Sequence, residues 1–131
     1  MSLISRFQTT DEIIEALLGQ KIVRGDRGLA QALTNHGEIV EFAPGQIIIE
    51  QGAADRDAYF LLMGKVQVIV NGVRLYCRES GVTVGEMSAI NSQITRAATI
   101  EAVEPTVALK VSHTQLAAAG EAYIDLWRLL A

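Results

Sequence analysis

A segment at residues 84–90 carries residue types that can bind a phosphorylated sugar. It reads Val-Gly-Glu-Met-Ser-Ala-Ile, which suits the end of a strand followed by one short helical turn. Backbone amides at the start of such a turn point outward without partners and favour an anion. Gly85 has no side chain, so a ligand can approach its backbone closely. Met87, Ser88 and Ala97 would contribute through their backbone amides, and Ala97 is also small enough to admit a phosphate close to the chain.

Two charged side chains complete this candidate site. Arg96 stands eleven positions after the glycine, at the start of the small, apolar run 97–103, and its planar guanidinium can donate to phosphate oxygens. Glu86 is unsuited to phosphate because both groups are anionic, but its carboxylate can accept hydrogen bonds from sugar hydroxyls. The alternatives for Arg96 are a surface arginine and a salt bridge with Glu86 or Glu101. The alternative for Glu86 is a carboxylate stabilised at a helix N-terminus.

The composition predicts a single domain in the cytoplasm. The chain has 131 residues, of which 50% are hydrophobic, enough for a sizeable core. The net charge of −4 argues against a broad nucleic-acid-binding face. Cys77 is the only cysteine, which excludes an internal disulfide, and the two histidines, His36 and His113, are too far apart in sequence to suggest a metal motif. We expect no signal peptide, and no apolar run reaches the roughly 20 residues of a membrane helix.

Helical periodicity marks both ends of the chain. Thr9 and Glu12 have capping-box spacing, and they begin an apolar helical face that ends at Gly19. A second helix is expected from Asp26 to His36. Near the C-terminus, three signals predict two further helices: a cap at Ser112 for residues 114–119, a break at Gly120, and a last helix over 122–130.

Between these helices the pattern is that of a β protein. From Glu38 the hydrophobic period is two, with turns at short intervals. Strands are expected at 38–42, 47–49, 59–63, 65–70, 73–78, 98–103 and 107–111. Asn71-Gly72 predicts a hairpin turn, and residues 52–57 form a polar loop. The fold class is therefore mainly β, a β-roll or jelly-roll-like barrel with flanking helices. The expected division is an N-terminal helical segment 1–37, a roll 38–111 that contains residues 84–99, and C-terminal helices 112–131.

These motifs carry a family resemblance. Gly-Glu-Met-Ser-Ala-Ile followed by Arg-Ala-Ala-Thr resembles the phosphate-binding cassette of cyclic nucleotide-binding domains. That family includes the bacterial catabolite activator protein, the regulatory subunits of protein kinase A and cyclic nucleotide-gated channels. Three further segments match in the same order, at 42–48, 58–66 and 105–109. The resemblance runs from Val40 to the C-terminus and implies a β-roll that binds a cyclic nucleotide monophosphate.

The resemblance implies a role for each residue of the candidate site. The cyclic phosphate would contact the amides of Gly85 to Ser88 together with Arg96, and Glu86 would hold the ribose 2′-hydroxyl. The base side is implied at Val68, Tyr76 and Val84, with Arg78 beside them, while Leu75, Val68 and Val84 are expected to face into the roll. Tyr123 and Trp127 are candidates for a lid over the base. Packing in the core is the alternative for the apolar members of this set.

Two departures from the family pattern leave the base undetermined. The family commonly has an aromatic residue before the cassette glycine and a proline before the arginine, where this chain has Val84 and Thr95. Ala97 replaces the Thr or Ser that often accompanies a preference for cyclic GMP. Cyclic AMP is therefore the default expectation, and cyclic UMP or cyclic CMP could take its place. No other cofactor is expected.

The resemblance implies a sensor, and no nucleophile–base pair suggests an enzyme. Ligand binding would be coupled to a fused or associated effector domain, because family members usually continue beyond the position where the last helix of this chain ends. That helix is also a candidate surface for a homodimer. A second hypothesis is an antiviral Pycsar effector, in which such domains are fused to TIR or membrane modules and read cyclic UMP or cyclic CMP. A cupin-like metalloenzyme and a structural or dimerisation roll that binds no ligand are two further hypotheses.

Overall fold

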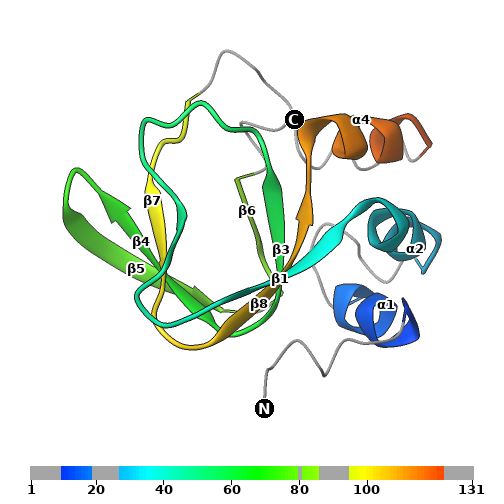
Figure 1. Ribbon diagram of the computed structural model, residues 1–131, viewed down its shortest axis with the longest axis horizontal. Coiled ribbons are helices and arrows are strands. Elements are labelled where there is room, and N and C mark those ends of the chain that lie inside the picture. Colours follow the sequence, from blue (N-terminus) through cyan, green and yellow to red (C-terminus); the bar gives the residue numbers. More distant parts are fainter. Residues whose placement is uncertain (1–9, 19–26, 80, 86–94, 123–131) are drawn as a thin grey trace.

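The computed structural model describes residues 10–18, 27–79, 81–85 and 95–122. Within these ranges, helices lie at both ends and strands lie between them (Figure 1). In chain order the elements are α1 (Thr10–Leu18), α2 (Arg27–His36), β1 (Glu38–Phe42), β2 (Ile47–Ile49), β3 (Ala58–Met63), β4 (Lys65–Val70), β5 (Val73–Glu79), β6 (Thr83–Val84), β7 (Thr99–Ala102), β8 (Thr106–Val111) and α4 (His113–Ala122). This order confirms the predicted β-roll with flanking helices.

The strands form two four-stranded antiparallel sheets. One has the order β1-β8-β3-β6 and the other β2-β7-β4-β5. The helices α1, α2 and α4 all lie beside the first sheet, whereas the β4–β5 hairpin projects on the opposite side of the molecule (Figure 1). The described part of the chain therefore has three layers: helices, a first sheet and a second sheet.

The strand β3 belongs to two hydrophobic cores because both of its faces are covered. Phe60 and Leu62 pack with α1, α2 and α4, while Tyr59 and Leu61 pack with residues of the second sheet. This double burial explains why β3 is a continuous apolar run rather than an alternating one. The strand β8 is buried on both sides in the same way. We regard β3 and β8 as the rigid centre on which the candidate site is built.

Two turns with left-handed backbone fix the shape of the second sheet. Asn71 and Gly72 have φ values of 52° and 79°, as a two-residue type I′ hairpin requires, so the predicted hairpin is confirmed. Gly64 joins β3 to β4 and carries the chain from one sheet to the other with a φ of 110°. A Cβ added there would lie 2.6 Å from the Thr106 Cα, so the close approach of β8 also requires glycine.

One prediction about local structure is wrong, and a second is left open. Gly120 does not break the last described helix, because α4 continues through it to Ala122. A glycine costs a helix only about 1 kcal/mol relative to alanine, and the preceding alanines favour the helical state. Leu75 has no partner on β4, because the register between β4 and β5 shifts at this point, and its side chain is 53% exposed, so its expected position facing into the roll stays a prediction. A one-residue bulge of this kind leaves no signal in the hydrophobic period.

Candidate functional site

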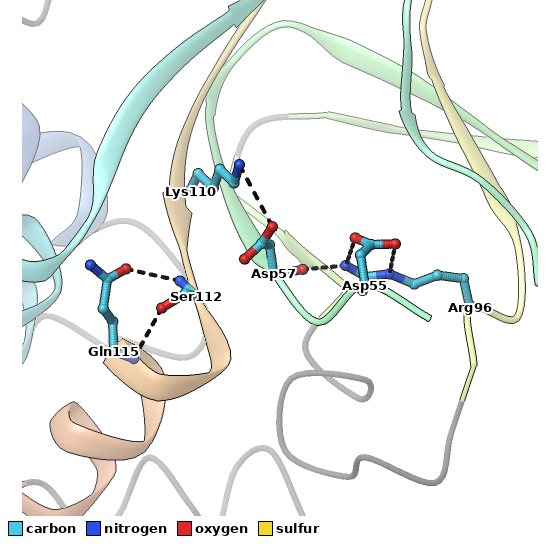
Figure 2. Close-up of polar contacts among 6 residues, drawn as sticks. All are labelled: Asp55, Asp57, Arg96, Lys110, Ser112 and Gln115. Carbon is cyan, nitrogen blue, oxygen red and sulfur yellow. Dashed lines mark hydrogen bonds and ion pairs between the residues drawn. The ribbon is translucent and has the colours of Figure 1, made fainter. Parts of the chain in front are cut away.

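The candidate site is centred on the guanidinium group of Arg96, which is almost completely buried with a side-chain exposure of 2%. Its Nε and Nη2 atoms donate to the two carboxylate oxygens of Asp55, at 3.3 and 2.6 Å (Figure 2). Nη2 also donates to the carbonyl oxygen of Asp57 at 2.6 Å, and Nη1 donates to the carbonyl oxygen of Gly85 at 2.8 Å. The Asp55 carboxylate and the two backbone carbonyl groups together offset the free-energy cost of burying the guanidinium cation.

The main chain of Arg96 is held as firmly as its side chain. Its backbone N–H donates to the Ala53 carbonyl at 3.0 Å, and its carbonyl accepts from the Gly52 N–H at 2.7 Å. Four residues of the loop between β2 and β3 therefore contact Arg96. Two of them contact the backbone of Arg96, and the other two contact its guanidinium. The loop is itself tied to the β4–β5 turn, where Gln51 and Asn71 exchange two hydrogen bonds of 3.0 and 2.8 Å.

Gly85 forms the other side of the site and must be glycine for two reasons. Its φ is 81°, in the left-handed region that side chains disfavour. An added Cβ would lie 2.5 Å from Arg96 Nη1, 2.8 Å from the Asp57 carbonyl oxygen and 2.9 Å from Ile49. The group that approaches Gly85 closely in this structure is the guanidinium of Arg96, and the approach of a ligand to the Gly85 backbone stays a prediction.

Within the described ranges, the hydrogen bonds of Arg96 leave one of its donors for a further acceptor. A guanidinium has five N–H donors, and four of them are directed at acceptors within the described ranges. The remaining N–H is on Nη1, the nitrogen beside Gly85. Asp55 fixes the guanidinium by its opposite edge, so that the Nη1 end faces the start of the cassette. This arrangement suits an anion held between Arg96 and the cassette backbone.

The ion pair with Arg96 also controls the ionisation of Asp55. Hydrogen bonding from the guanidinium, opposed by burial and assisted by its positive charge, holds the pKa of Asp55 below its ordinary value of 3.8. A carboxylate with a lowered pKa stabilises the folded state above its unfolded-state pKa. That contribution is lost as the pH falls through the lower pKa of the folded state.

Replacing Asp55 should therefore make stability less dependent on acid pH. We expect Asp55→Asn to be less stable than the wild type at neutral pH by on the order of 1 kcal/mol, since Asp55 is 44% exposed and solvent screens its ion pair. The difference should narrow as the pH falls below about 4. Urea unfolding between pH 7 and pH 3 measures it. The control is Glu79→Gln, which removes an exposed carboxylate 4.0 Å from Lys65 Nζ. An equal pH dependence for wild type and Asp55→Asn would contradict this account.

Asp57 links the site to the last described helix. Its carboxylate lies 3.6 Å from Lys110 Nζ on β8, while its carbonyl accepts from Arg96 (Figure 2). Ser112 follows β8 and caps α4 as predicted: its Oγ accepts from the Gln115 N–H at 3.2 Å, and its own N–H donates to Gln115 Oε1 at 3.0 Å. A continuous set of polar contacts and one strand therefore connects Arg96 to α4.

The remaining predicted site residues are only partly brought together. Val68 and Val84 are buried in the core between the two sheets, Tyr76 is 55% exposed and Ala97 is exposed. The strand expected at 98–103 is observed as β7, Thr99–Ala102, one residue shorter at each end. Five predicted ligand or lid residues, Glu86, Met87, Ser88, Tyr123 and Trp127, lie outside the described residues.

The partners of Arg96 are the part of the site that the sequence did not reveal. Asp55 and Asp57 were expected only as members of a polar loop, and Glu86 or Glu101 was considered as the salt-bridge partner. The structure pairs Glu101 with Arg74 at 3.0 Å, which excludes it as the partner of Arg96. The spacing Asp-x-Asp before a buried strand was the available signal, but a separation of 41 residues gives no period from which contact can be read.

Some other kinds of site find no support in the described ranges. They contain no group of three or more His, Cys, Asp or Glu side chains that could hold a metal ion. None of the helices in these ranges has the length and hydropathy that a membrane crossing requires.

Solved structures with the same arrangement of strands and helices are known. The regulatory subunit of a cAMP-independent protein kinase A from Trypanosoma brucei aligns with a TM-score of 0.80 and 23% identity, over 95% of this chain and 47% of that one. The regulatory domain of Toxoplasma gondii protein kinase A with cAMP aligns with a TM-score of 0.80 and 17% identity, over 95% and 49%. At these identities the likeness establishes the fold alone.

Curated sequences show a closer relationship. The Pycsar effector protein BcPycTIR of Burkholderia cepacia is 38% identical over 90% of this chain and 39% of its own length. The Pycsar effector protein XpPycTIR of Xanthomonas perforans is 37% identical over 98% and 44%. This chain thus spans less than half the length of these relatives. The family profile described as "Cyclic nucleotide-binding domain" matches residues 39–123, which include β1 except its first residue, β2 to β8 and all of α4. The chain belongs to the cyclic nucleotide-binding domain family.

Proposed function

We propose that this chain is a sensor that binds a cyclic nucleotide monophosphate at Gly85 and Arg96. The observation that carries the proposal is the buried guanidinium of Arg96, which is fixed by Asp55 and has one N–H of Nη1, beside Gly85, with no acceptor within the described ranges. The cyclic phosphate would accept from Arg96 and from the cassette amides, including those of Met87 and Ser88. Glu86 would accept from the ribose 2′-hydroxyl, as the family resemblance implies.

The output would be a change in the position of α4. A phosphate that accepts from Nη1 would draw the guanidinium toward the cassette and lengthen its hydrogen bonds to Asp55 and to the Asp57 carbonyl, so binding would loosen the loop between β2 and β3. Asp57 would transmit that change to Lys110, and β8 would transmit it to Ser112 and α4. Such a switch shifts populations only by the difference in ligand affinity between the two states.

A more specific role is favoured by the curated relatives. Because they are named Pycsar effectors and are 37–38% identical to almost the whole of this chain, we propose that this chain is the sensor part of an effector of that type. The effector domain would be fused to it or associated with it, and α4 with the following residues would communicate with that domain. Reaction chemistry, if the complete protein has it, would belong to the effector domain.

Calorimetric titration with cyclic AMP, GMP, CMP and UMP tests the proposal. We expect saturable one-to-one binding of at least one of them, because the site offers a fixed cation and backbone donors to a phosphodiester. The corresponding linear 5′-monophosphates serve as controls for charge without the cyclic diester. If none of the four binds, the chain is a structural or dimerisation roll. If metal analysis instead returns stoichiometric iron, zinc or manganese, the cupin-like hypothesis is revived.

A further inference from the structure

The side chain of Gln51 joins two turns that lie far apart in the sequence. Its Nε2 donates to Asn71 Oδ1 at 3.0 Å, and its Oε1 accepts from the Asn71 backbone N–H at 2.8 Å. Because a backbone N–H can only donate, it determines which atom of the Gln51 amide is the oxygen. The two hydrogen bonds, here called the Gln51–Asn71 contact, fix both the distance and the orientation between the β2–β3 loop and the β4–β5 turn.

The backbone of Gln51 is bound to the start of β7. Its N–H donates to Thr99 Oγ1 at 3.0 Å, and Thr99 lies opposite Ile69 in the β4–β7 pair. Ile69 in turn precedes Asn71 by two residues. The ends of β2 and β4 and the start of β7 therefore meet around Gln51. Since β7 begins three residues after Arg96, this junction is also next to the arginine in the chain.

The β2–β3 loop holds Arg96 in two separate places. In its first half, the Gly52 N–H donates to the Arg96 carbonyl at 2.7 Å, and the Ala53 carbonyl accepts from the Arg96 N–H at 3.0 Å. In its second half, Asp55 and Asp57 accept from the guanidinium, each at 2.6 Å. The first half fixes the main chain of Arg96 and the second half fixes its side chain. Hydrogen bonds weaken steeply with poor geometry, so a displaced first half would displace Arg96 as a whole.

We propose that Gln51 is a positioning residue for the phosphate site, which anchors the first half of the loop and so keeps the main chain of Arg96 in place for the nucleotide. The role rests on the proposed function, because it acts on nucleotide affinity through Arg96. Ordering a mobile loop during binding opposes affinity, and a contact that orders it in the free protein removes that cost. The second half then remains the part that loosens when the guanidinium moves toward the cassette, while residues 51–53 stay fixed to the β4–β5 turn.

Variants at both ends of the Gln51–Asn71 contact test this role. Gln51→Met keeps the length of the side chain and removes both hydrogen bonds. Asn71→Gly removes only the Oδ1 acceptor, and glycine readily adopts the left-handed backbone of the turn, where φ is 52°. Asn71→Asp keeps an acceptor at that place and is the conservative rescue. The matched control is Gln46→Met, since Gln46 Oε1 accepts from the Ala43 N–H at 3.0 Å in the turn before β2.

Each protein is titrated calorimetrically with cyclic AMP, GMP, CMP and UMP. For whichever of them binds the wild type, we expect Gln51→Met to weaken binding by roughly three- to tenfold and Asn71→Gly to weaken it less. Asn71→Asp and Gln46→Met should stay within about twofold of the wild type. A residue that only stabilised the fold would leave the affinity of the folded protein unchanged.

Hydrogen exchange followed by NMR in the nucleotide-free protein gives a second readout. The amide hydrogens of Gly52 and Arg96 both donate within the anchored part of the site. They should exchange roughly threefold or more faster in Gln51→Met than in the wild type, while Gln46→Met leaves them unchanged. Unchanged exchange in Gln51→Met would show that the first half of the loop is held without this contact, and would overturn the role of Gln51.

The outcomes also separate this role from the proposed function. A folded Gln51→Met variant that binds nucleotide as the wild type does overturns the role of Gln51 and leaves the sensor intact, and so does an equal loss of affinity in Gln46→Met. A wild type that binds none of the four nucleotides overturns both. Circular dichroism confirms that each variant is folded. If Gln51→Met does not fold, Asn71→Gly decides, with wild-type affinity and wild-type exchange counting against the role.

Discussion

Arg96→Gln is expected to weaken nucleotide binding by roughly 100-fold or more, since it removes a charge-assisted hydrogen bond from a site that is largely closed to water. The glutamine amide cannot donate to Asp55 and to the phosphate together. It has two N–H donors in place of five, so some of the acceptors that now bind the guanidinium would lose their hydrogen bonds. We expect the folded state to lose about 2–4 kcal/mol as well, because the Gly85 and Asp57 carbonyls would lack partners and Asp55 would lose its cation. Calorimetry measures the affinity, and urea unfolding measures the stability.

Two controls make the result on Arg96 interpretable. Arg74→Gln removes a guanidinium that pairs with Glu101 on the outer face of the second sheet, and it should preserve both affinity and stability within experimental error. Arg96→Lys keeps the positive charge in the site but cannot bind Asp55 bidentately. Its free energy of unfolding should therefore lie between those of the wild type and Arg96→Gln. Unchanged nucleotide affinity in a folded Arg96→Gln variant would show that the phosphate binds elsewhere.

Most of the fold is readable from the sequence because its signals are local. Asn71-Gly72 specifies a hairpin by the backbone angles it allows, and the alternation of Val66 and Val68 with polar residues specifies the face of β4. The cap at Ser112 likewise follows from side-chain chemistry within four residues. Gly120 shows the limit of such signals, since a weak local preference against helix does not decide the end of α4.

The site is only half readable, for a physical reason. Gly85 and Arg96 can be recognised as candidates from their residue types. The carboxylate that fixes Arg96 lies 41 residues earlier in the sequence, and only the folded sheets bring the two together. The exposure of Tyr76 and the partly buried, unpaired state of Arg78 within the described ranges likewise depend on which strands end up opposite β5. Sequence reasoning places both on one face of a strand, and the register shift at Leu75 then determines that Arg74 points to the other.

Gly85→Ala should be the most damaging single-methyl change near the site. Alanine at this position would have to adopt a left-handed backbone conformation. Its Cβ would lie within 2.9 Å of Arg96 Nη1, the Asp57 carbonyl oxygen and Ile49. We expect a loss of about 2–4 kcal/mol in the free energy of unfolding, made up of backbone strain and overpacking in comparable parts. Nucleotide affinity should fall at the same time, since relief of the overlap requires the guanidinium to move away from the cassette.

Gly72→Ala separates strain from overlap. Gly72 has nearly the same φ, 79° against 81°, but an added Cβ there has no atom within 4 Å. Its alanine variant should therefore lose only the strain, about 1 kcal/mol, and bind nucleotide as the wild type does. The difference in the free energy of unfolding between the two variants then measures the cost of the overlap between the added methyl group and the atoms that surround Gly85, including Arg96 Nη1. If both variants lose the same stability and keep the same affinity, the contact between Gly85 and Arg96 is too soft to position a phosphate. In that case the cassette, and not the arginine, would have to supply the specificity of the site.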